Sequence, residues 1–262
     1  ISRGEKLSSS VIRKLCDFFH CPEEDLYTII CDNPLLRQLR EEKDYKISGG
    51  LYHELQIRMT YNSNHMEGSA LSEDQTRRIF ETNTIDSEES LSVDDIIETI
   101  NHFRAIDYCI DIADEPLTES NIKHLHYILK SRTKVETLSW FNVGDYKARP
   151  NIVGGMETSE PKDVATDMQH LLFSYTEKKH ISFEDIVEFH FRFERIHPFQ
   201  DGNGRLGRLI AFKECLKHNL VPFIIEDKKK SFYYRGLSEY LNEPGYLIDT
   251  CYDGQETMMK LL

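Results

Sequence analysis

Apolar residues recur every three or four positions along most of the chain, and short polar breaks with glycine, proline or asparagine separate these stretches. This period is typical of amphipathic helices that bury one face against a core. It predicts helices at residues 10–19, 22–30, 51–67, 73–81, 93–112, 162–178, 183–197 and 203–218, and another that begins at Thr118. The sequence therefore predicts a mainly α-helical protein.

The ends of these segments carry helix-capping signals. Ser72 and Gln75 have the spacing of a capping box, and Gly68 follows the end of a predicted helix. Pro198 ends the helix before it, because proline disfavours a helical conformation in the preceding residue. Gly207 lies inside a predicted helix, where it costs roughly 1 kcal/mol relative to alanine. We therefore expect another element to approach the backbone closely at Gly207.

Residues 140–156 interrupt the helical pattern. Short runs of β-branched and aromatic residues occur here, and glycine and proline break them. This composition predicts two short strands that form a β-hairpin.

The composition is that of a folded, acidic protein. Of the 262 residues, 29% are charged and 39% hydrophobic, and the formal net charge is −13. Nucleic acid is not expected as a partner, because phosphate backbones attract basic surfaces. The six cysteines form no C-x-x-C pair, so we expect a reducing environment. No apolar stretch reaches the roughly 20 residues of a membrane span and no signal peptide is evident, so we expect a cytoplasmic protein without membrane contact.

Residues 197–208 hold the densest group of candidate catalytic side chains. His197 is a titratable base whose unperturbed pKa lies near neutral pH. Asp201 is a hard oxygen ligand, of the type that Mg2+ uses when it also holds a substrate phosphate. A zinc pair of His190 and His197 is the alternative, but their spacing of seven residues exceeds the three to five that zinc sites on one helix prefer.

The residues after Asp201 predict an anion-binding site. Gly202 and Gly204 permit a tight turn with exposed N–H groups, and a helix that starts at Asn203 adds its positive dipole end. Arg205 and Arg208 share one face of that helix, where both can bind phosphate oxygens. The sequence thus predicts a magnesium and polyphosphate site with a histidine at its edge.

The stretch from His197 to Arg208 matches without a gap the signature H-x-F-x-[DE]-G-N-G-R-x-x-R of the Fic family of AMP-transferring enzymes. The resemblance extends over roughly residues 60–242. It implies a Fic-type helical bundle with a short β-hairpin flap over the active site. It also implies that His197 is the catalytic base, that Mg2+ binds Asp201 and that ATP is the co-substrate. The implied nucleotide contacts in this stretch are Gly202, Asn203, Gly204, Arg205 and Arg208, with the Asn203 side chain also near the metal.

A second segment resembles the inhibitory motif of this family. The stretch from Ser63 to Gly68 fits [ST]-x-x-x-E-[GN], and its Glu67 stands at a helix C-terminus, where a carboxylate opposes the helix dipole. In the family this glutamate pairs with the second arginine of the nucleotide loop, here Arg208, and excludes a productive γ-phosphate. Because the motif precedes the catalytic loop, the chain resembles the class whose inhibitory helix is amino-terminal to the Fic core. Ser69 differs from the asparagine that relatives often have there.

The resemblance also assigns the hairpin. It would be the flap, with Val153, Gly154 and Gly155 beside the nucleotide and an exposed edge that holds a target protein segment by β-addition. Lys147 stands where relatives usually have arginine, which puts any bidentate contact of that residue in doubt.

The adenine contacts implied by the resemblance lie near the end of the chain. Tyr233 and Tyr234 resemble the Y-Y-x-x-L segment whose aromatic rings flank the adenine in the family. Asn242 fits the asparagine expected seven to nine residues further on.

These patterns divide the chain into four parts. We expect an amino-terminal helical extension at 1–50, the inhibitory helix and the next helix at 51–90, the catalytic core at 91–242 with its flap at 140–156, and a carboxy-terminal tail at 243–262.

The implied activity is transfer of AMP from ATP to a Ser, Thr or Tyr hydroxyl of a target protein or of the chain itself, inhibited by Glu67. The alternatives are removal of AMP, with Glu67 orienting a water, and a catalytically silent nucleotide-sensing module. His197 argues against the silent module, because phosphate binding needs no base. Gly204 argues against phosphorylation, since a phosphorylating relative has Asn-Lys-Arg in the loop. Homodimer formation is left open.

Overall fold

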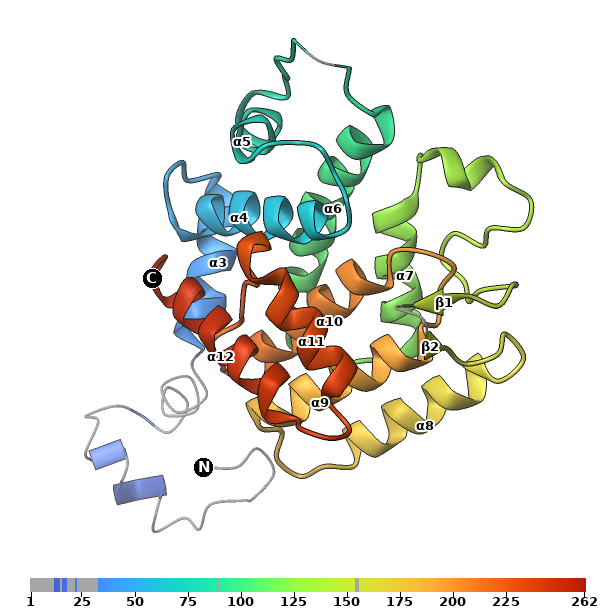
Figure 1. Cartoon of the computed structure of the whole chain (residues 1–262). Helices are drawn as coiled ribbons and strands as arrows, with labels where there is room; N and C mark the ends of the chain where they lie inside the picture. Colours follow the sequence, from blue (N-terminus) through green and yellow to red (C-terminus); the bar gives the residue numbers. More distant parts are fainter. Residues whose placement is uncertain (1–11, 15, 18–21, 23–32, 89, 154–155) are drawn as a thin grey trace.

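A computed structural model of the chain describes residues 12–14, 16–17, 22, 33–88, 90–153 and 156–262. The helices predicted at residues 10–19 and 22–30 fall largely outside these ranges. The secondary structure of the described residues is nearly all helical (Figure 1). The α-helices are α3 (Pro34–Tyr45), α4 (Leu51–Met66), α5 (Glu73–Thr82), α6 (Val93–Asp111), α7 (Glu119–Lys130), α8 (Val164–Thr176), α9 (Phe183–Ile196), α10 (Asn203–Lys217), α11 (Lys230–Glu239) and α12 (Gly245–Met259). Two short 3-10 helices are η1 (Lys134–Thr137) and η2 (Asp227–Lys229).

The helices predicted between residues 51 and 218 are confirmed, with ends that differ by one or two residues. The capping box of Ser72 and Gln75 is present at the start of α5. Gly68, just after α4, has φ 97°, a left-handed conformation that suits glycine. No helix in the described ranges is both long and apolar enough to cross a membrane.

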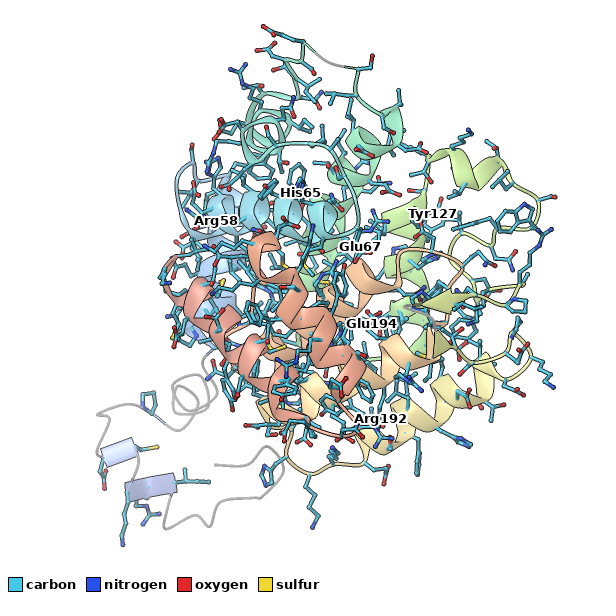
Figure 2. All side chains as sticks on the ribbon, in the orientation of Figure 1. Arg58, His65, Glu67, Tyr127, Arg192 and Glu194 are labelled. Atoms are coloured by element: carbon cyan, nitrogen blue, oxygen red, sulfur yellow. The ribbon has the colours of Figure 1, made fainter. Side chains whose placement is uncertain are left out.

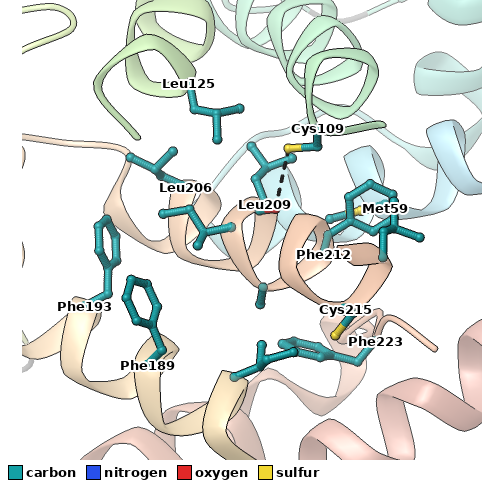
Figure 3. Close-up of a cluster of buried hydrophobic side chains, with 14 of the residues drawn as sticks. Met59, Cys109, Leu125, Phe189, Phe193, Leu206, Leu209, Phe212, Cys215 and Phe223 are labelled. Carbon is teal, nitrogen blue, oxygen red and sulfur yellow. Dashed lines mark hydrogen bonds between the residues drawn. The ribbon is translucent and has the colours of Figure 1, made fainter. Parts of the chain in front are cut away.

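Helix α10 runs through the centre of the molecule, with α9, α6, α7 and α4 packed around it (Figure 1). Thirteen of its 15 residues are buried. Figure 3 shows Leu206 and Leu209 of α10 in the same buried cluster as Leu125 of α7 and Phe193 of α9. The loop between α9 and α10 is therefore anchored in the core at both ends, which makes it a rigid mounting for a site.

Helix α5 braces α4, the helix that ends beside Glu67. Arg77 of α5 donates hydrogen bonds to both carboxylate oxygens of Glu54 on α4, at 2.9 and 3.0 Å. A second, smaller hydrophobic cluster lies beneath α5 and includes the buried Leu71 and Phe103. The Arg77–Glu54 pair therefore joins α4 to α5 away from the C-terminal end of α4.

Within residues 243–262, expected to be a tail, Gly245–Met259 form the packed helix α12. In α12 the side chains of Leu247, Cys251 and Met258 are buried. Helix α11 packs closely on α12, since a Cβ atom on Gly236 would lie 2.7 Å from the Cα of Leu247. The polar residues between the apolar positions of α12 hide its period, so the pattern did not predict it.

Two short strands lie between η1 and α8. Strand β1 (Ile152–Val153) pairs antiparallel with β2 (Met156–Glu157), with Ile152 opposite Glu157. The two strands lie where strands were predicted, but Gly154 and Gly155 between them lie outside the described residues, so the flap over the active site stays a prediction.

Candidate active site

The loop histidine lies where α9 ends. His197 has φ 51° and ψ 61°, and its backbone N–H donates to the carbonyl of Phe193 at 2.9 Å. This left-handed conformation is uncommon for a residue with a Cβ atom, and strained residues of this kind cluster at functional sites. The turn directs the chain out of α9 and into the loop.

The imidazole of His197 is held in a form that can accept a proton. Its side chain is 14% exposed, and Nδ1 lies 3.4 Å from the carbonyl oxygen of Glu194. A carbonyl oxygen only accepts, so this contact favours hydrogen on Nδ1 and leaves the lone pair on Nε2. Burial lowers the pKa of His197 to about 4, and the charge of Lys147 acts in the same direction. The ring is therefore neutral at pH 7.

Asn203 braces the loop from inside. Its Oδ1 accepts the N–H of Phe199 at 2.9 Å, and its Nδ2 donates to the Phe199 carbonyl at 2.8 Å. The side chain is buried. Both ends of the amide are thus used by the loop backbone, which differs from the nucleotide and metal contact that the resemblance implied for Asn203.

His126 ties the loop to the segment that precedes the hairpin. Its Nδ1 accepts the N–H of Gly144 at 2.9 Å, so the ring hydrogen lies on Nε2, which contacts the carbonyl of Asp201 at 3.2 Å. The ring also stacks on Phe199, with centroids 4.0 Å apart. Burial lowers the pKa of His126 to about 3, so this link does not change near neutral pH.

The N-terminus of α10 forms an anion cradle. Gly202, with φ 81°, makes the turn into the helix. A Cβ atom on Gly204 would lie 2.3 Å from Oε1 of Glu67, so the absence of a side chain leaves room for that carboxylate. Free N–H groups and the helix dipole favour negative charge at this position. Glu67 provides the negative charge in this structure.

Arg208 is bound by the last turn of α4. Its Nε donates to Ser63 Oγ at 3.0 Å, and its Nη2 donates to the Ser63 carbonyl at 3.0 Å and to Oε1 of Glu67 at 2.7 Å. The Arg208 side chain is 5% exposed and that of Glu67 29%. Burial lowers the pKa of Arg208, but the Glu67 charge outweighs it and raises that pKa overall. The pair predicted from the two motifs is therefore in contact, and Figure 2 shows Glu67 at the end of α4, next to the centre of the molecule.

Arg205 contacts a different helix. Its Nη1 donates to Glu98 of α6, and Glu98 also accepts from Lys130 of α7. Lys130 Nζ donates to Oδ2 of Asp201 at 2.6 Å, and Nη2 of Arg205 lies 3.8 Å from the same oxygen. Desolvation opposes ionisation of Asp201, but these two cations outweigh it and lower the pKa of Asp201 to about 2. Two carboxylates and two cations thus alternate beneath the loop.

Residues 116–214 match the Fic/DOC family model. The chain carries a Fic/DOC domain. Among solved structures, a Fic domain containing signaling protein from Bacteroides thetaiotaomicron is similar, with a TM-score of 0.69 at 23% identity over 86% of this chain and 93% of that chain. Fic-1 from C. elegans has a TM-score of 0.68 at 17% identity, over 91% of this chain and 74% of that chain. These likenesses establish the helical Fic fold.

Curated relatives named protein adenylyltransferase Fic are also similar in sequence. The one from Drosophila erecta is 27% identical over 186 residues, which are 68% of this chain and 35% of the relative. The one from Aedes aegypti is 26% identical over 187 residues, 69% of this chain and 36% of the relative. The chain therefore spans about a third of the length of the curated relatives it matches.

Asp201 fits the metal ligand expected in a Fic domain. Its side chain is 52% exposed, with Lys130 bound to Oδ2 and a backbone hydrogen bond from Gly202 to the carboxylate. Within the described ranges, no group of three or more His, Cys, Asp or Glu side chains could hold a metal ion. A single carboxylate beside an anion cradle suits Mg2+, which binds through one or two carboxylates together with substrate phosphates.

The first of the two tyrosines expected at the adenine lies in the hydrophobic core. Tyr233 is 1% exposed, and its hydroxyl is 2.6 Å from Nε2 of His190. The guanidinium of Arg208 lies 5.8 Å from the centroid of the Tyr233 ring. The Tyr233 ring thus lies against the guanidinium of Arg208 on the side of the hydrophobic core. His190 is bound to Tyr233 and buried, so the alternative of a zinc pair with His197 fails.

The second tyrosine presents an accessible ring. Tyr234 is 43% exposed, and its hydroxyl donates at 3.0 Å to the carbonyl of Met66, the residue before Glu67. Of the two tyrosines, only Tyr234 therefore has a ring available to a base. Asn242 lies at the surface after α11, and its Nδ2 donates to Glu239 at 3.3 Å.

Lys147 fastens the base of the hairpin. Its Nζ donates to Asn151 Oδ1 and Thr158 Oγ1, both at 2.7 Å, and to the carbonyl of Ile196 at 3.4 Å. Asn151 precedes β1 and Thr158 follows β2, so one ammonium group joins both ends of the hairpin to the end of α9. Burial lowers the pKa of Lys147 to about 8. The replacement of the family's arginine by lysine therefore leaves an anchor at this position.

Glu194 carries a largely buried carboxyl group that the motif did not indicate, and its side chain is 12% exposed. A Cβ atom on Gly207 would lie 2.7 Å from its Oε1 and 2.7 Å from Nδ1 of His190, which confirms the close approach expected at Gly207. Burial and the charge of Glu67 raise the pKa of Glu194 to about 8, so the group is protonated at pH 7. Figure 2 shows Glu194 near the centre of the molecule, on α9. In the sequence, the only indication of a role for Glu194 is its position three residues before His197 of the motif.

Proposed function

We propose that this chain transfers AMP from ATP to a hydroxyl group of a target protein, and that Glu67 inhibits the reaction. The observation that carries the proposal is one assembly: a neutral imidazole at His197 beside an anion cradle with Arg205 and Arg208. The names of the similar proteins support the same activity. A base next to an anion site suits attack by a hydroxyl group on a phosphate ester.

In the proposed mechanism, Nε2 of His197 accepts the proton of the target hydroxyl as its oxygen attacks the α-phosphorus of ATP. The bond from that phosphorus to the β-phosphate oxygen breaks, and pyrophosphate leaves. The N–H groups at the start of α10 and the guanidinium of Arg205 stabilise the charge on the phosphates. Mg2+ held by Asp201 would supply further positive charge to the phosphates. AMP passes directly to the target, so no covalent enzyme intermediate is needed.

The contact between Glu67 and Arg208 supports the proposed inhibition. The Glu67 carboxylate lies at the cradle beside Gly204, where a phosphate would bind, and it occupies one nitrogen of Arg208. A bound γ-phosphate would add negative charge at the same place, so the two anions compete. Within the described residues, Nη1 of Arg208 has no hydrogen-bond partner, and it lies 3.2 Å from where a Cβ atom on Gly204 would stand, which leaves one donor beside the cradle.

The hairpin is the proposed docking place for the target. Ile152 of β1 is 70% exposed, and a two-residue pair of strands leaves backbone N–H and C=O groups for another strand. Pairing with the backbone would hold a target segment in extended form and read little of its sequence. Its hydroxyl group would then face His197.

Labelling with α-32P-ATP and Mg2+ tests this function. The Glu67→Gly protein should place label on a target or on itself, and the Glu67→Gly/His197→Ala protein should lose it by ~10²–10⁴-fold. His170→Ala, at an exposed histidine of α8, serves as the matched control and should label fully. Label that survives the loss of His197 would refute the proposed base.

Removal of AMP from a modified target is a second activity that the site permits. Glu67 lies beside the loop, and its charge reaches the His197 imidazole. A carboxylate there can orient a water for attack on the phosphorus. Glu67→Gly should then raise transfer but lower release of AMP from a labelled target. Equal release by both proteins would exclude this role for Glu67.

A further inference from the structure

Lys130 makes the most direct contact with the side chain of the proposed metal ligand. Its Nζ lies 2.6 Å from Oδ2 of Asp201, and its side chain is 3% exposed. The aliphatic stem packs under the loop, since a Cβ atom on Gly202 would lie 3.4 Å from Cδ of Lys130. The ammonium group is thus fixed in place and is not a mobile surface charge.

Glu98 holds Lys130 and Arg205 in this arrangement. Its carboxylate bridges the two cations, and its side chain is 17% exposed. The four groups Lys130, Arg205, Glu98 and Asp201 carry two positive and two negative charges, so the cluster is neutral without a metal ion. Glu98 and Lys130 come from α6 and α7, outside the stretch of residues 197–208.

This neutrality has a consequence for cations that approach Asp201. A solvent-exposed carboxylate attracts a divalent ion, but a fixed ammonium group within hydrogen-bond distance of it repels that ion. The repulsion falls when polyphosphate brings its own negative charge to the α10 cradle. Metal entry at Asp201 then depends on the phosphates.

We propose that Lys130 is a positioning residue that holds Oδ2 of Asp201 and keeps free divalent cations off this carboxylate until a nucleotide supplies its phosphates. Glu98 keeps the lysine in place. The proposal rests on the proposed function, because it assigns the metal–phosphate side of that site. It concerns a step before chemistry, so it can be measured without turnover.

Binding of Mn2+ to the nucleotide-free protein, measured by electron paramagnetic resonance, tests the proposal. Lys130→Met and Lys130→Gln should each bind Mn2+ at least ~10-fold more tightly than the unchanged chain, because one positive charge beside Asp201 is lost. The glutamine variant keeps a polar group for Glu98 and decides the result if the methionine variant does not fold. Glu98→Gln should change the affinity in the opposite direction, because it leaves the cluster with an extra positive charge.

The control is Lys123→Met, on the same helix α7, where the lysine pairs with Glu119 and Asp145. It should bind Mn2+ as the unchanged chain does. A folded Lys130→Gln protein with unaltered or weaker Mn2+ affinity would overturn the proposal. AMP transfer is measured separately with labelled ATP. Transfer with an unaltered Mn2+ affinity would refute only the role of Lys130, whereas tighter Mn2+ binding without transfer would refute only the proposed function.

Discussion

Replacement of Glu67 by glycine is expected to raise AMP transfer by ~10–100-fold, because it frees Arg208 and empties the cradle of its own carboxylate. Glu67 Oε1 lies 2.7 Å from Nη2 of Arg208. Two unit charges at that separation interact by about 6 kcal/mol at an effective dielectric constant of about 20. Glu67 is 29% exposed, so solvent screens part of this attraction. A net of ~1.5–3 kcal/mol remains, and each 1.4 kcal/mol corresponds to a factor of about ten.

The assay compares initial rates of transfer from α-32P-ATP at limiting ATP, together with ATP affinity by calorimetry. Glu67→Gln should act in the same direction as Glu67→Gly, because it removes the charge while it keeps the size of the side chain. Glu177→Gly is the matched control, since Glu177 caps the C-terminus of α8 as Glu67 caps that of α4, whereas the carboxylate bound to Arg208 is that of Glu67. It should leave the rate unchanged.

Arg208→Ala separates inhibition from phosphate binding. The variant loses the contact with Glu67, but it also loses the guanidinium that would bind the γ-phosphate, so its rate should stay low. The double variant with Glu67→Gly should resemble Arg208→Ala alone. If Glu67→Gly and Glu67→Gln both label a competent target no faster than the unchanged chain, Glu67 is a helix cap without an inhibitory role.

Three further predictions concern groups around the loop. Gly207→Ala should lower the melting temperature and cost ~1–3 kcal/mol, because its Cβ would meet Glu194 and His190 at 2.7 Å, and this outweighs the gain in helix propensity. The pKa of Glu194 is raised to about 8 in the folded protein, whereas the unfolded carboxyl group releases its proton near pH 4.5, so this group lowers the free energy of unfolding as the pH rises from 5 to 8. Glu194→Gln removes the titration and should therefore reduce that loss of stability. Urea unfolding at both pH values checks this, and equal changes in both proteins would contradict it. Lys147→Met should lower the rate of transfer at saturating ATP by roughly 10-fold or more, because the ammonium group joins the hairpin to Ile196. Lys147→Arg should retain most of the rate. Equal rates in the two variants would exclude this role of Lys147.

The sequence predicted the elements whose pattern is local. The helices from residue 51 to residue 218 follow from apolar period and capping residues, and both signals act within a few positions of the chain. Helix α12 escaped prediction because polar residues interrupt its apolar period, and its burial depends on packing against α11 and α9. The loop from His197 to Arg208 was predictable because its chemistry is concentrated in one stretch.

The partners of the loop were harder to predict, because they come from distant parts of the chain. Ser63 and Glu67 could be paired with Arg208 only through a second motif, across more than 140 residues. Glu98 and Lys130 belong to no such motif, and on a helical wheel they read as ordinary charged surface positions. Only the packing of α6 and α7 against α10 brings them to the loop.

Each arginine of the loop binds one carboxylate, and a phosphate can replace the carboxylate on Arg208 more easily than the one on Arg205. Glu98 binds two cations, Arg205 and Lys130, and is 17% exposed, so its removal from the cluster would leave both cations without their shared partner. Glu67 binds the single cation Arg208, is 29% exposed and lies at the last turn of α4, where the helix dipole opposes it. A phosphate that enters the cradle therefore displaces Glu67 at lower cost than Glu98. Arg205 belongs to a fixed cluster, and Arg208 belongs to a contact that a nucleotide can replace.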